Sequence, residues 1–374
     1  MIERTYQPLN QFLEKNKVLV IYGPRRVGKT TLINHFLSTT TLKYKSESGD
    51  NIRVQEILSS SDFELIKEYC REYQLIVLDE AQNIPHVGKG LKIIVDNVPG
   101  IYVIATGSSS FDLSNKIGEP LVGRQRILKL FPLSMLELNG EYNKIELSQR
   151  LEEFMIYGLY PEVVTAKGKN EKTEYLHDLV NSYLLKDILA LENIKSPKLL
   201  MDLLRMLAFQ TGSEVSLNEL ANGLRIDVKT VSRYIDLLEK SFIIISLGGF
   251  SRNLRNEITS KKKYYFLDQG IRNGVINAFN PTETRNDMGP LWENFMVIER
   301  LKKKTYQHIY SNDYFWRTYS KKEIDLIEER DGKLFGFEFK WKDQSYTAPD
   351  EWARNYTDSN VELISRQNFW SFIL

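Results

Sequence analysis

The chain has 374 residues, two to three times the length of a typical domain, which excludes a single small module. Its composition is that of a globular protein, and 50 Lys and Arg residues balance 49 Asp and Glu residues, so the net charge of +1 gives no overall sign of nucleic-acid binding. The single cysteine, Cys70, excludes an intrachain disulfide framework and a multi-thiolate zinc site, and it fits a reducing cytoplasm. The four histidines leave little for a His-based metal cluster.

The start of the chain lacks the pattern of an exported protein. Residues from Met1 to Gln11 show no charged-then-apolar signal, and no apolar run approaches the roughly 18 residues that span a bilayer. We therefore expect a cytoplasmic protein that does not enter a membrane.

A phosphate-binding loop is predicted directly after the first apolar strand, Val18 to Tyr22. The segment Gly23-Pro-Arg-Arg-Val-Gly-Lys29-Thr30 matches the P-loop pattern and precedes a stretch of helical period. In such a loop the backbone N–H groups wrap the phosphates, and glycine avoids a clash at close approach. Lys29 is expected to reach the β- and γ-phosphates, and Thr30 to ligate Mg²⁺. The predicted nucleotide-binding residues are Gly23, Pro24, Arg25, Arg26, Val27, Gly28, Lys29, Thr30 and Thr31.

A second apolar strand, Leu75 to Leu78, ends in two carboxylates. Four consecutive apolar residues indicate a strand that is covered on both faces. Asp79 then emerges at the carboxyl edge of the sheet, where ligands bind in open α/β folds. We assign Asp79 to the magnesium ion and Glu80 to activation of the attacking water. The alternative is a strand that ends in a solvated acidic turn.

A third strand, Ile101 to Ala105, ends in Thr106-Gly-Ser-Ser109. A hydroxyl at this position could sense the γ-phosphate or the attacking water, and Ser108 is the first candidate. A serine-rich turn after a strand is also plain turn chemistry, so that alternative stays open.

Eight segments follow one another along nearly the whole chain in an order that is typical of one family. They are Gly23-Pro-Arg-Arg-Val-Gly-Lys-Thr-Thr31, Leu78-Asp-Glu-Ala-Gln82, Thr106-Gly-Ser-Ser-Ser110, Val122-Gly-Arg124, Phe131-Pro-Leu-Ser-Met-Leu-Glu137, Val231-Ser-Arg-Tyr-Ile-Asp-Leu-Leu-Glu-Lys240, Ser251-Arg-Asn-Leu-Arg255 and Tyr264-Tyr-Phe-Leu-Asp-Gln-Gly-Ile-Arg-Asn273. In these segments the chain resembles a prokaryotic AAA-type P-loop ATPase family whose members carry a C-terminal domain of unknown function.

This resemblance implies an AAA-type fold with ATP as the nucleotide. It also implies that Arg124 contacts the γ-phosphate, either within its own chain or as a finger offered to a neighbouring subunit. The alternative for Arg124 is a surface ion pair. An oligomer is compatible with this reading, and the sequence does not fix its size.

A winged helix-turn-helix is predicted at the end of a long helical region. The pattern is helical from about Asn143 to Lys240, and Ser216-Leu-Asn-Glu219 predicts a capping box. Asp227 can cap a second helix, which the strand Phe242 to Leu247 follows. This order of elements is that of a winged helix-turn-helix.

The second helix of this motif is the candidate DNA-binding element. Lys229, Thr230 and Arg233 would point into a major groove, and the basic stretch from Arg252 to Lys263 would meet phosphates. Winged helices also act as protein-interaction modules, so a solvated basic face is the alternative.

A carboxylate-rich hairpin is predicted near the C-terminus. Asp331-Gly332 is a two-residue turn signal, and it sets the register of the two strands. Facing carboxylates repel unless they share a cation or a proton. The apolar pairs define the buried face, and Lys340 lies on the face of Glu338. The predicted pairs are Arg330/Lys333, Leu326/Phe337, Asp325/Glu338 and Ile324/Phe339.

The spacing of Asp325 and Glu338-x-Lys340 resembles the PD-(D/E)xK nuclease core. There the acids bind Mg²⁺ and the lysine orients the attacking water. Glu293, in a predicted helix from about Leu291 to Lys304, could add the helical acid that many such folds have. A nuclease-like fold without activity and a solvated hairpin in another register are the alternatives.

We therefore expect an α/β protein that combines an AAA-type parallel sheet, a helical lid, a winged helix-turn-helix and a nuclease-like α/β domain. The expected boundaries are 1–140, 141–205, 206–263 and 264–374. The expected function is Mg²⁺-dependent ATP hydrolysis that controls engagement of DNA or a protein partner by the C-terminal half. A metal-dependent nuclease gated by ATP and a non-catalytic ATP-switched binding module are the two alternatives.

Overall fold

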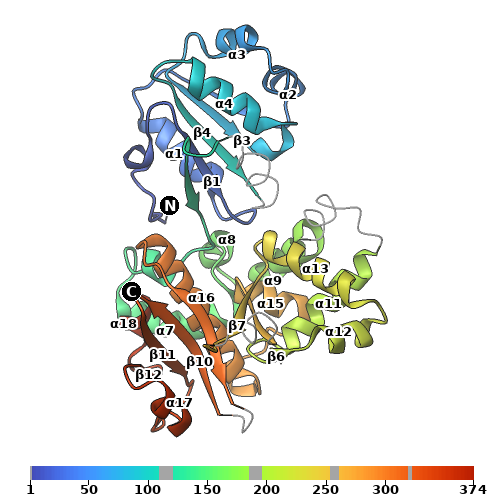
Figure 1. Ribbon diagram of the computed structural model, residues 1–374, viewed down its shortest axis with the longest axis vertical. Helices are drawn as coiled ribbons and strands as arrows, with labels where there is room; N and C mark the ends of the chain where they lie inside the picture. Colours follow the sequence, from blue (N-terminus) through green and yellow to red (C-terminus); the bar gives the residue numbers. More distant parts are fainter. Residues whose placement is uncertain (1, 109–120, 185–195, 253–260, 319–321) are drawn as a thin grey trace. The chain divides into compact units, whose positions relative to one another are not determined.

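The computed structural model describes residues 2–108, 121–184, 196–252, 261–318 and 322–374, and its contacts divide the chain into two units (Figure 1). Unit 1 comprises Met1–Pro132 with Lys240–Phe242, and unit 2 comprises Leu133–Glu239 with Ile243–Leu374. Most of the expected basic stretch before Lys263, including Arg255, lies outside the described residues. Across those described ranges, no helix is both long and apolar enough to cross a membrane.

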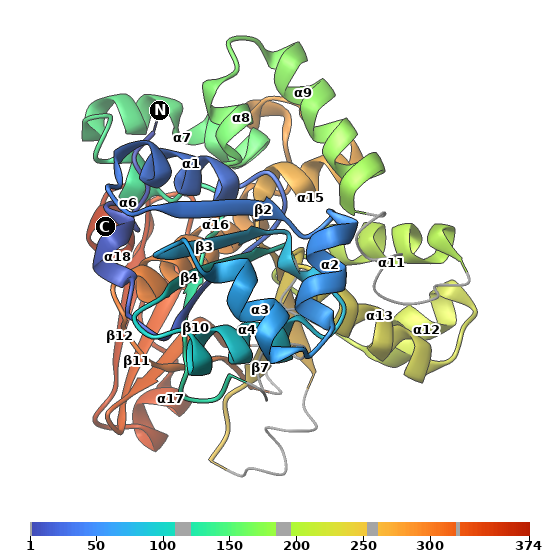
Figure 2. The ribbon, with the colours of Figure 1, turned by 90° about the horizontal axis from the view of Figure 1, so that it is seen from above.

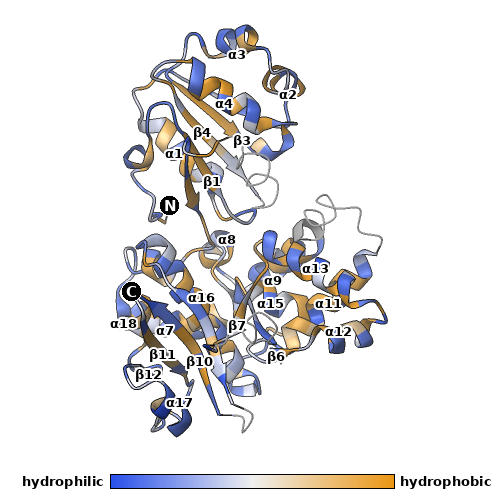
Figure 3. Cartoon of the chain, viewed as in Figure 1, coloured by the Kyte–Doolittle hydropathy of each residue, from blue (hydrophilic) through white to orange (hydrophobic). Residues whose placement is uncertain are grey.

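Unit 1 is built on a parallel sheet of five strands in the order β2-β3-β4-β1-β5. Its inner strands are apolar up to their carboxyl ends because helices cover both faces, as the orange parts of β3 and β4 show in Figure 3. The parallel α/β sheet expected from the sequence is confirmed. The strands are β1 (Val18–Tyr22), β2 (Tyr44–Ser48), β3 (Leu75–Asp79), β4 (Tyr102–Gly107) and β5 (Gln125–Lys129).

The two faces of this sheet are covered by different helices (Figure 2). Alternate side chains of β1 point to opposite faces, so Val18 and Val20 join one buried cluster with Leu91 and Ile94 of α4. The helices α2 and α3 pack on that same side, and α1 with η1 lies on the other. The helical elements are η1 (Leu9–Phe12), α1 (Lys29–Thr39), α2 (Ile52–Ser59), α3 (Phe63–Cys70), η2 (Ala81–Asn83) and α4 (Val87–Asn97).

Unit 2 contains a mixed sheet of seven strands in the order β12-β11-β10-β9-β7-β8-β6. The strands of the expected winged helix, β6 to β8, continue directly into those of the C-terminal segment, because β7 pairs with β9. β8 crosses the expected boundary between 263 and 264. The strands are β6 (Glu214–Val215), β7 (Ile244–Gly249), β8 (Lys262–Phe266), β9 (Asn312–Arg317), β10 (Glu323–Arg330), β11 (Lys333–Phe339) and β12 (Asn360–Ile364).

The long helix α16 packs against β8 and β11 of this sheet (Figure 1). The described residues from 144 to 184 and from 197 to 209 are mainly helical, as expected. The helical elements of unit 2 are α6 (Met135–Leu138), α7 (Lys144–Tyr157), α8 (Pro161–Thr165), α9 (Lys169–Asp178), η3 (Leu179–Leu184), α11 (Pro197–Phe209), α12 (Leu217–Leu224), α13 (Val228–Lys240), α15 (Gln269–Ile276), η4 (Thr282–Thr284), α16 (Met288–Tyr306), α17 (Asp350–Asn355) and α18 (Phe369–Ile373).

Asp268 connects two of these helical segments. It caps α15 through the N–H groups of Gly270 and Ile271, and its second oxygen accepts the N–H of Leu159, 2.7 Å away, just after α7. Burial raises the pKa of Asp268 to about 6 against the opposing effect of these N–H groups. This part of the motif from Tyr264 to Asn273 therefore has a structural role.

Candidate functional site

The predicted P-loop runs between the end of β1 and the start of α1. Gly28 has a φ of +94° and precedes the first residue of the helix, a conformation that a side chain would strain. Lys29 is buried, and its ammonium group donates hydrogen bonds of 2.8 Å to the carbonyls of Gly23 and Pro24. The predicted nucleotide-binding residues thus form one continuous turn, with the lysine folded back on the loop.

Arg4, in the N-terminal segment, hydrogen-bonds to this loop. No motif in the sequence predicted this contact. The buried guanidinium donates to the carbonyl of Val27 inside the loop and, over 2.7 Å, to the carbonyl of Phe131. The loop backbone is therefore held to the segment that follows β5.

Thr30 and Asp79 lie side by side at the carboxyl edge of the sheet. The Thr30 hydroxyl donates to one oxygen of the Asp79 carboxylate at 2.8 Å, and the Thr106 hydroxyl donates to the other oxygen. Thr106 is fully buried at the end of β4 and also accepts the N–H of Glu80, 3.0 Å away. The ends of β3 and β4 and the start of α1 thus orient one carboxylate beside the P-loop.

Glu80 lies immediately beyond β3 with a φ of 50°. Its carboxylate accepts a hydrogen bond from the side-chain amide of Gln82, and the same amide lies 3.3 Å from the Ser108 hydroxyl. The sequence predicted Glu80 and Ser108 but assigned no role to Gln82, although that residue belongs to the Leu78–Gln82 segment. The three side chains form one hydrogen-bonded group.

Arg124 lies at the amino ends of the strands, whereas the P-loop lies at their carboxyl ends. This position corrects the expectation that Arg124 contacts the γ-phosphate within its own chain. β1 and β5 run parallel with Val18 beside Gln125, so Arg124 is level with the start of β1 and the P-loop follows its end. Five residues of strand separate the two levels by roughly 15 Å. Arg124 instead forms an ion pair with Asp96, which was the alternative expected. A role toward a neighbouring subunit stays a prediction.

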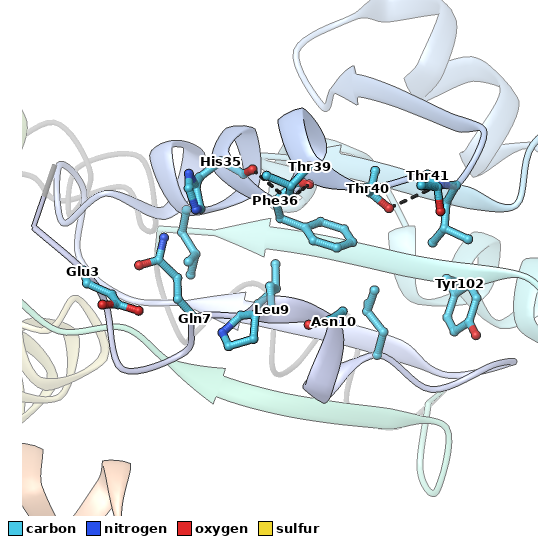
Figure 4. Close-up of a pocket in the computed structure, with 14 residues that line it drawn as sticks. Glu3, Gln7, Leu9, Asn10, His35, Phe36, Thr39, Thr40, Thr41 and Tyr102 are labelled. Carbon is cyan, nitrogen blue, oxygen red and sulfur yellow. Dashed lines mark hydrogen bonds between the residues drawn. The ribbon is translucent and has the colours of Figure 1, made fainter.

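A groove runs along α1 that no sequence pattern indicated (Figure 4). It has a volume of about 500 Å³ and lies between α1 and the N-terminal segment of unit 1. Its lining includes Gln7, Leu9, His35, Phe36 and Tyr102.

In unit 2 the C-terminal hairpin has the predicted pairs Leu326/Phe337 and Arg330/Lys333, and the pairs Asp325/Glu338 and Ile324/Phe339 stay predictions. β10 and β11 pair from Leu326/Phe337 to Arg330/Lys333, and the turn residue Asp331 has a φ of 50°. The prediction that only one face is buried is wrong. A bulge between Ile324 and Ile327 brings both into a cluster with Trp352, while Phe337 packs on Phe372 of α18 on its own face.

The carboxylates predicted for a second site gather in one buried cluster. Asp325 and Glu338 are each 3% exposed, and Glu338 forms an ion pair of 2.7 Å with Lys340. Glu293 of α16 joins them through Lys263, whose ammonium lies 2.9 Å from Glu293 and 3.4 Å from Asp325. Lys263 comes from β8, 62 residues before Asp325, so no local pattern could indicate it.

The charged groups in this cluster shift one another's pKa values. Burial and the Asp325 carboxylate raise the pKa values of Glu293 and of Glu338. Burial opposes the charged form of Lys263, yet the carboxylates of Glu293 and Asp325 outweigh burial and raise its pKa. Lys263 is therefore a charged ammonium enclosed by acids.

A divalent metal does not fit this cluster as it stands. Among the described residues, no group of three or more His, Cys, Asp or Glu side chains is arranged to hold a metal ion. The position between Glu293 and Asp325 is taken by the Lys263 ammonium. The Lys263 ammonium therefore lies beside Asp325, one of the two carboxylates for which the nuclease-like spacing predicts a metal.

The predicted DNA-contacting residues lie on α13. Lys229 and Arg233 are exposed, whereas Thr230 is used locally, since its hydroxyl and its N–H both donate to the capping Asp227. The capping box expected at Ser216 is not formed by its side chain. Two of the three predicted contact residues, Lys229 and Arg233, are thus exposed.

Comparison with protein families identifies the N-terminal part of the chain. Residues 15–139 match a family described as AAA domain, which covers the P-loop and the Asp79–Glu80 pair. Residues 148–282 and 288–362 match two families that are each described as a domain of unknown function. Unit 1 therefore contains an AAA-type P-loop domain, a nucleotide-binding fold.

Relatives of the whole chain are themselves described as uncharacterized. One from Mycobacterium tuberculosis is 26% identical over 340 residues, which cover 89% of this chain and 72% of the relative. Another, from Haemophilus influenzae, is 26% identical over 352 residues and covers 88% of this chain and 83% of the relative. A third, from Methanocaldococcus jannaschii, is 26% identical over 334 residues, with shares of 83% and 72%.

Solved structures give distant similarity only. A replication initiator DnaA bound to AMPPCP and single-stranded DNA is 16% identical, with a TM-score of 0.30 over 63% of this chain and 86% of that one. A signal transduction ATPase with numerous domains from Pyrococcus horikoshii is 13% identical, with a TM-score of 0.30 over 81% of this chain and 46% of that one. Similarity this low carries no inference about ligands.

Proposed function

We propose that the protein is a Mg²⁺-dependent ATPase whose hydrolysis controls the engagement of DNA or a protein partner by unit 2. The observation that carries the first part is the meeting of four reactive groups at one edge of the sheet in unit 1. These groups are the Lys29 ammonium, the Thr30 hydroxyl and the carboxylates of Asp79 and Glu80. The match of residues 15–139 to an AAA domain supports ATP as the nucleotide.

The donors beside the P-loop fit a magnesium ion. Mg²⁺ prefers oxygen ligands, and Thr30 and Asp79 offer a hydroxyl and a carboxylate that are hydrogen-bonded to each other. When bound there, the ion would neutralise charge on the phosphates during hydrolysis. Thr106 would keep the Asp79 carboxylate turned toward Thr30, because its hydroxyl occupies the other carboxylate oxygen.

The chain's own side chains supply the remaining steps. Lys29 would exchange the carbonyls of Gly23 and Pro24 for phosphate oxygens when ATP enters the loop. Glu80 would take a proton from the water that attacks the γ-phosphorus, as the bond from that phosphorus to the leaving ADP oxygen breaks. Gln82 would hold the Glu80 carboxylate and link it to Ser108.

Two substitutions test the assignment. Lys29→Ala should abolish ATP turnover, because it removes the ammonium expected to contact the β- and γ-phosphates. Glu80→Gln should bind ATP and turn it over at least about a hundredfold more slowly, because the amide cannot accept the proton. Loss of ATP binding in Glu80→Gln would mean that the acidic pair is structural. Tight ATP binding without turnover by the natural chain would favour the non-catalytic switch.

The exposed side chains of α13 support DNA as the partner of unit 2. Lys229 and Arg233 lie one turn apart on the exposed face of the helix, where they can reach phosphates or base edges. The nuclease alternative requires a divalent metal among Glu293, Asp325 and Glu338, and the Lys263 ammonium argues against it.

A further inference from the structure

The carboxylate cluster of unit 2 contains its own cation. Lys263 is 1% exposed, and its ammonium is within ion-pair distance of both Glu293 and Asp325. An acidic site that takes a divalent ion must leave a position open between its carboxylates. Here that position is filled from within the chain.

Other groups of the chain also donate to these two carboxylates. The oxygen of Glu293 that faces Lys263 also accepts the Tyr265 hydroxyl, 2.7 Å away, and the second oxygen of Asp325 accepts the N–H of Phe339, 3.0 Å away. One carboxylate oxygen of Glu338 is buried without a hydrogen-bond partner. Both oxygens of Asp325 and one oxygen of Glu293 thus have partners within the chain.

The backbone of Lys263 is held inside the sheet. Its strand, β8, pairs with β6 on one edge and with β7 on the other, and Lys263 lies opposite Glu214 and Leu247 in these pairings. Its side chain also passes near the ring of Phe315, whose centroid lies 5.5 Å from the ammonium. The sheet therefore fixes the position of the Lys263 backbone, and the carboxylates of Glu293 and Asp325 hold its ammonium.

We propose that Lys263 is a built-in cation that takes the place of a divalent metal, so that unit 2 has a nuclease-like carboxylate cluster that binds no metal. An ammonium neutralises the charge of the acids but does not activate a bound water as a divalent ion does. The cluster then holds the sheet to α16, and unit 2 engages its partner without cutting phosphodiester bonds. This inference does not depend on ATP hydrolysis by unit 1.

The inference predicts that removal of the ammonium opens a metal site. Lys263→Met keeps most of the side-chain length and leaves Glu293 and Asp325 facing each other without a cation, which makes a divalent ion favourable. Mn²⁺ is the probe, and its binding to the full-length chain is measured by loss of the free-ion electron paramagnetic resonance signal. All proteins carry Asp79→Asn, and no nucleotide is present, so that the P-loop does not contribute.

The expected result is a gain of about tenfold or more in Mn²⁺ affinity for Lys263→Met over the Asp79→Asn parent, and no cleavage of DNA by the parent in Mg²⁺ or Mn²⁺. Lys302→Met is the matched control. Lys302 is equally buried and donates to the carbonyl of Leu133, but Glu299 is the one carboxylate among the described residues that forms an ion pair with it, so its loss should give no Mn²⁺ site.

Two results would overturn the inference. The first is Mn²⁺ binding by the Asp79→Asn parent that disappears when Asp325→Asn is added. The second is a folded Lys263→Met protein, shown by circular dichroism, that binds no Mn²⁺. If Lys263→Met does not fold, Mn²⁺ binding by the Asp79→Asn parent tests the inference without it. The absence of binding that depends on Asp325 supports the inference, and its presence refutes it.

Discussion

The Thr106 hydroxyl contacts the carboxylate of Asp79 and the backbone N–H of Glu80. This hydroxyl can be replaced by a methyl group with little change in side-chain shape. Thr106→Val replaces the hydroxyl by a methyl group at a fully buried position. The Asp79 carboxylate loses one donor, and the N–H of Glu80 loses its acceptor. A buried N–H left without a partner costs about 1–3 kcal/mol, and a hydrogen bond to a charged group contributes about 1.5–3 kcal/mol.

We therefore expect Thr106→Val to lower the free energy of unfolding by about 2–4 kcal/mol, after the gain from burying the extra methyl group. The turnover number for ATP should fall roughly tenfold to a hundredfold, because Asp79 and Glu80 lose the group that orients them. Urea denaturation followed by circular dichroism measures the first effect, and steady-state phosphate release measures the second.

Thr106→Ser is the control, because it keeps the hydroxyl and loses only a methyl group. It should retain most of the activity. If Thr106→Val has the natural midpoint of unfolding and the natural turnover number, the hydroxyl does not orient the two acids and this reading of the site is refuted.

Three further predictions follow from single contacts. Arg124→Ala should leave ATP affinity unchanged and lower the unfolding free energy by at most about 1 kcal/mol, since it removes an exposed ion pair with Asp96; a marked loss of ATP affinity in calorimetry would contradict its place at the far edge of the sheet. Lys229→Ala with Arg233→Ala should weaken binding to duplex DNA and reduce the salt dependence by about one released ion per charge in fluorescence titrations, and unchanged binding would remove α13 as the contact. Burial raises the pKa of Asp268 from 3.8 to about 6, with the Lys302 ammonium partly opposing the rise, so the folded state retains its proton longer than the unfolded state. The unfolding free energy should therefore fall by about 3 kcal/mol as pH rises from about 4 to 6, and this slope should vanish in Asp268→Asn; a slope that persists in that variant would show another group to be responsible.

The sequence alone was sufficient where local patterns carry the chemistry. The P-loop turn, the position of Asp79 and Glu80 at the end of β3 and the hairpin pairs from Leu326/Phe337 to Arg330/Lys333 each depend on residues close together in the chain, and the structure places them as expected. The continuous apolar runs of β1, β3 and β4 were enough to predict a buried parallel sheet.

The sequence was insufficient where distant segments meet. Arg4 lies 23 residues before its P-loop partner Val27, and Lys263 lies 62 residues before Asp325. Neither residue belongs to a motif that predicts the contact. Arg124 was misplaced because a motif gives order along the chain but not the edge of the sheet on which a residue lies. The bulge in β10 could not be anticipated either, because strict alternation assigns Ile324 and Ile327 to opposite faces.

The most direct test of the central proposal is phosphate release from ATP in the presence of Mg²⁺, measured for the natural chain and for Lys29→Ala, each with and without duplex DNA. We predict steady hydrolysis by the natural chain that responds to DNA, and no hydrolysis by Lys29→Ala under either condition. Equal hydrolysis by the two proteins would contradict the assignment of the P-loop as the site of the reaction.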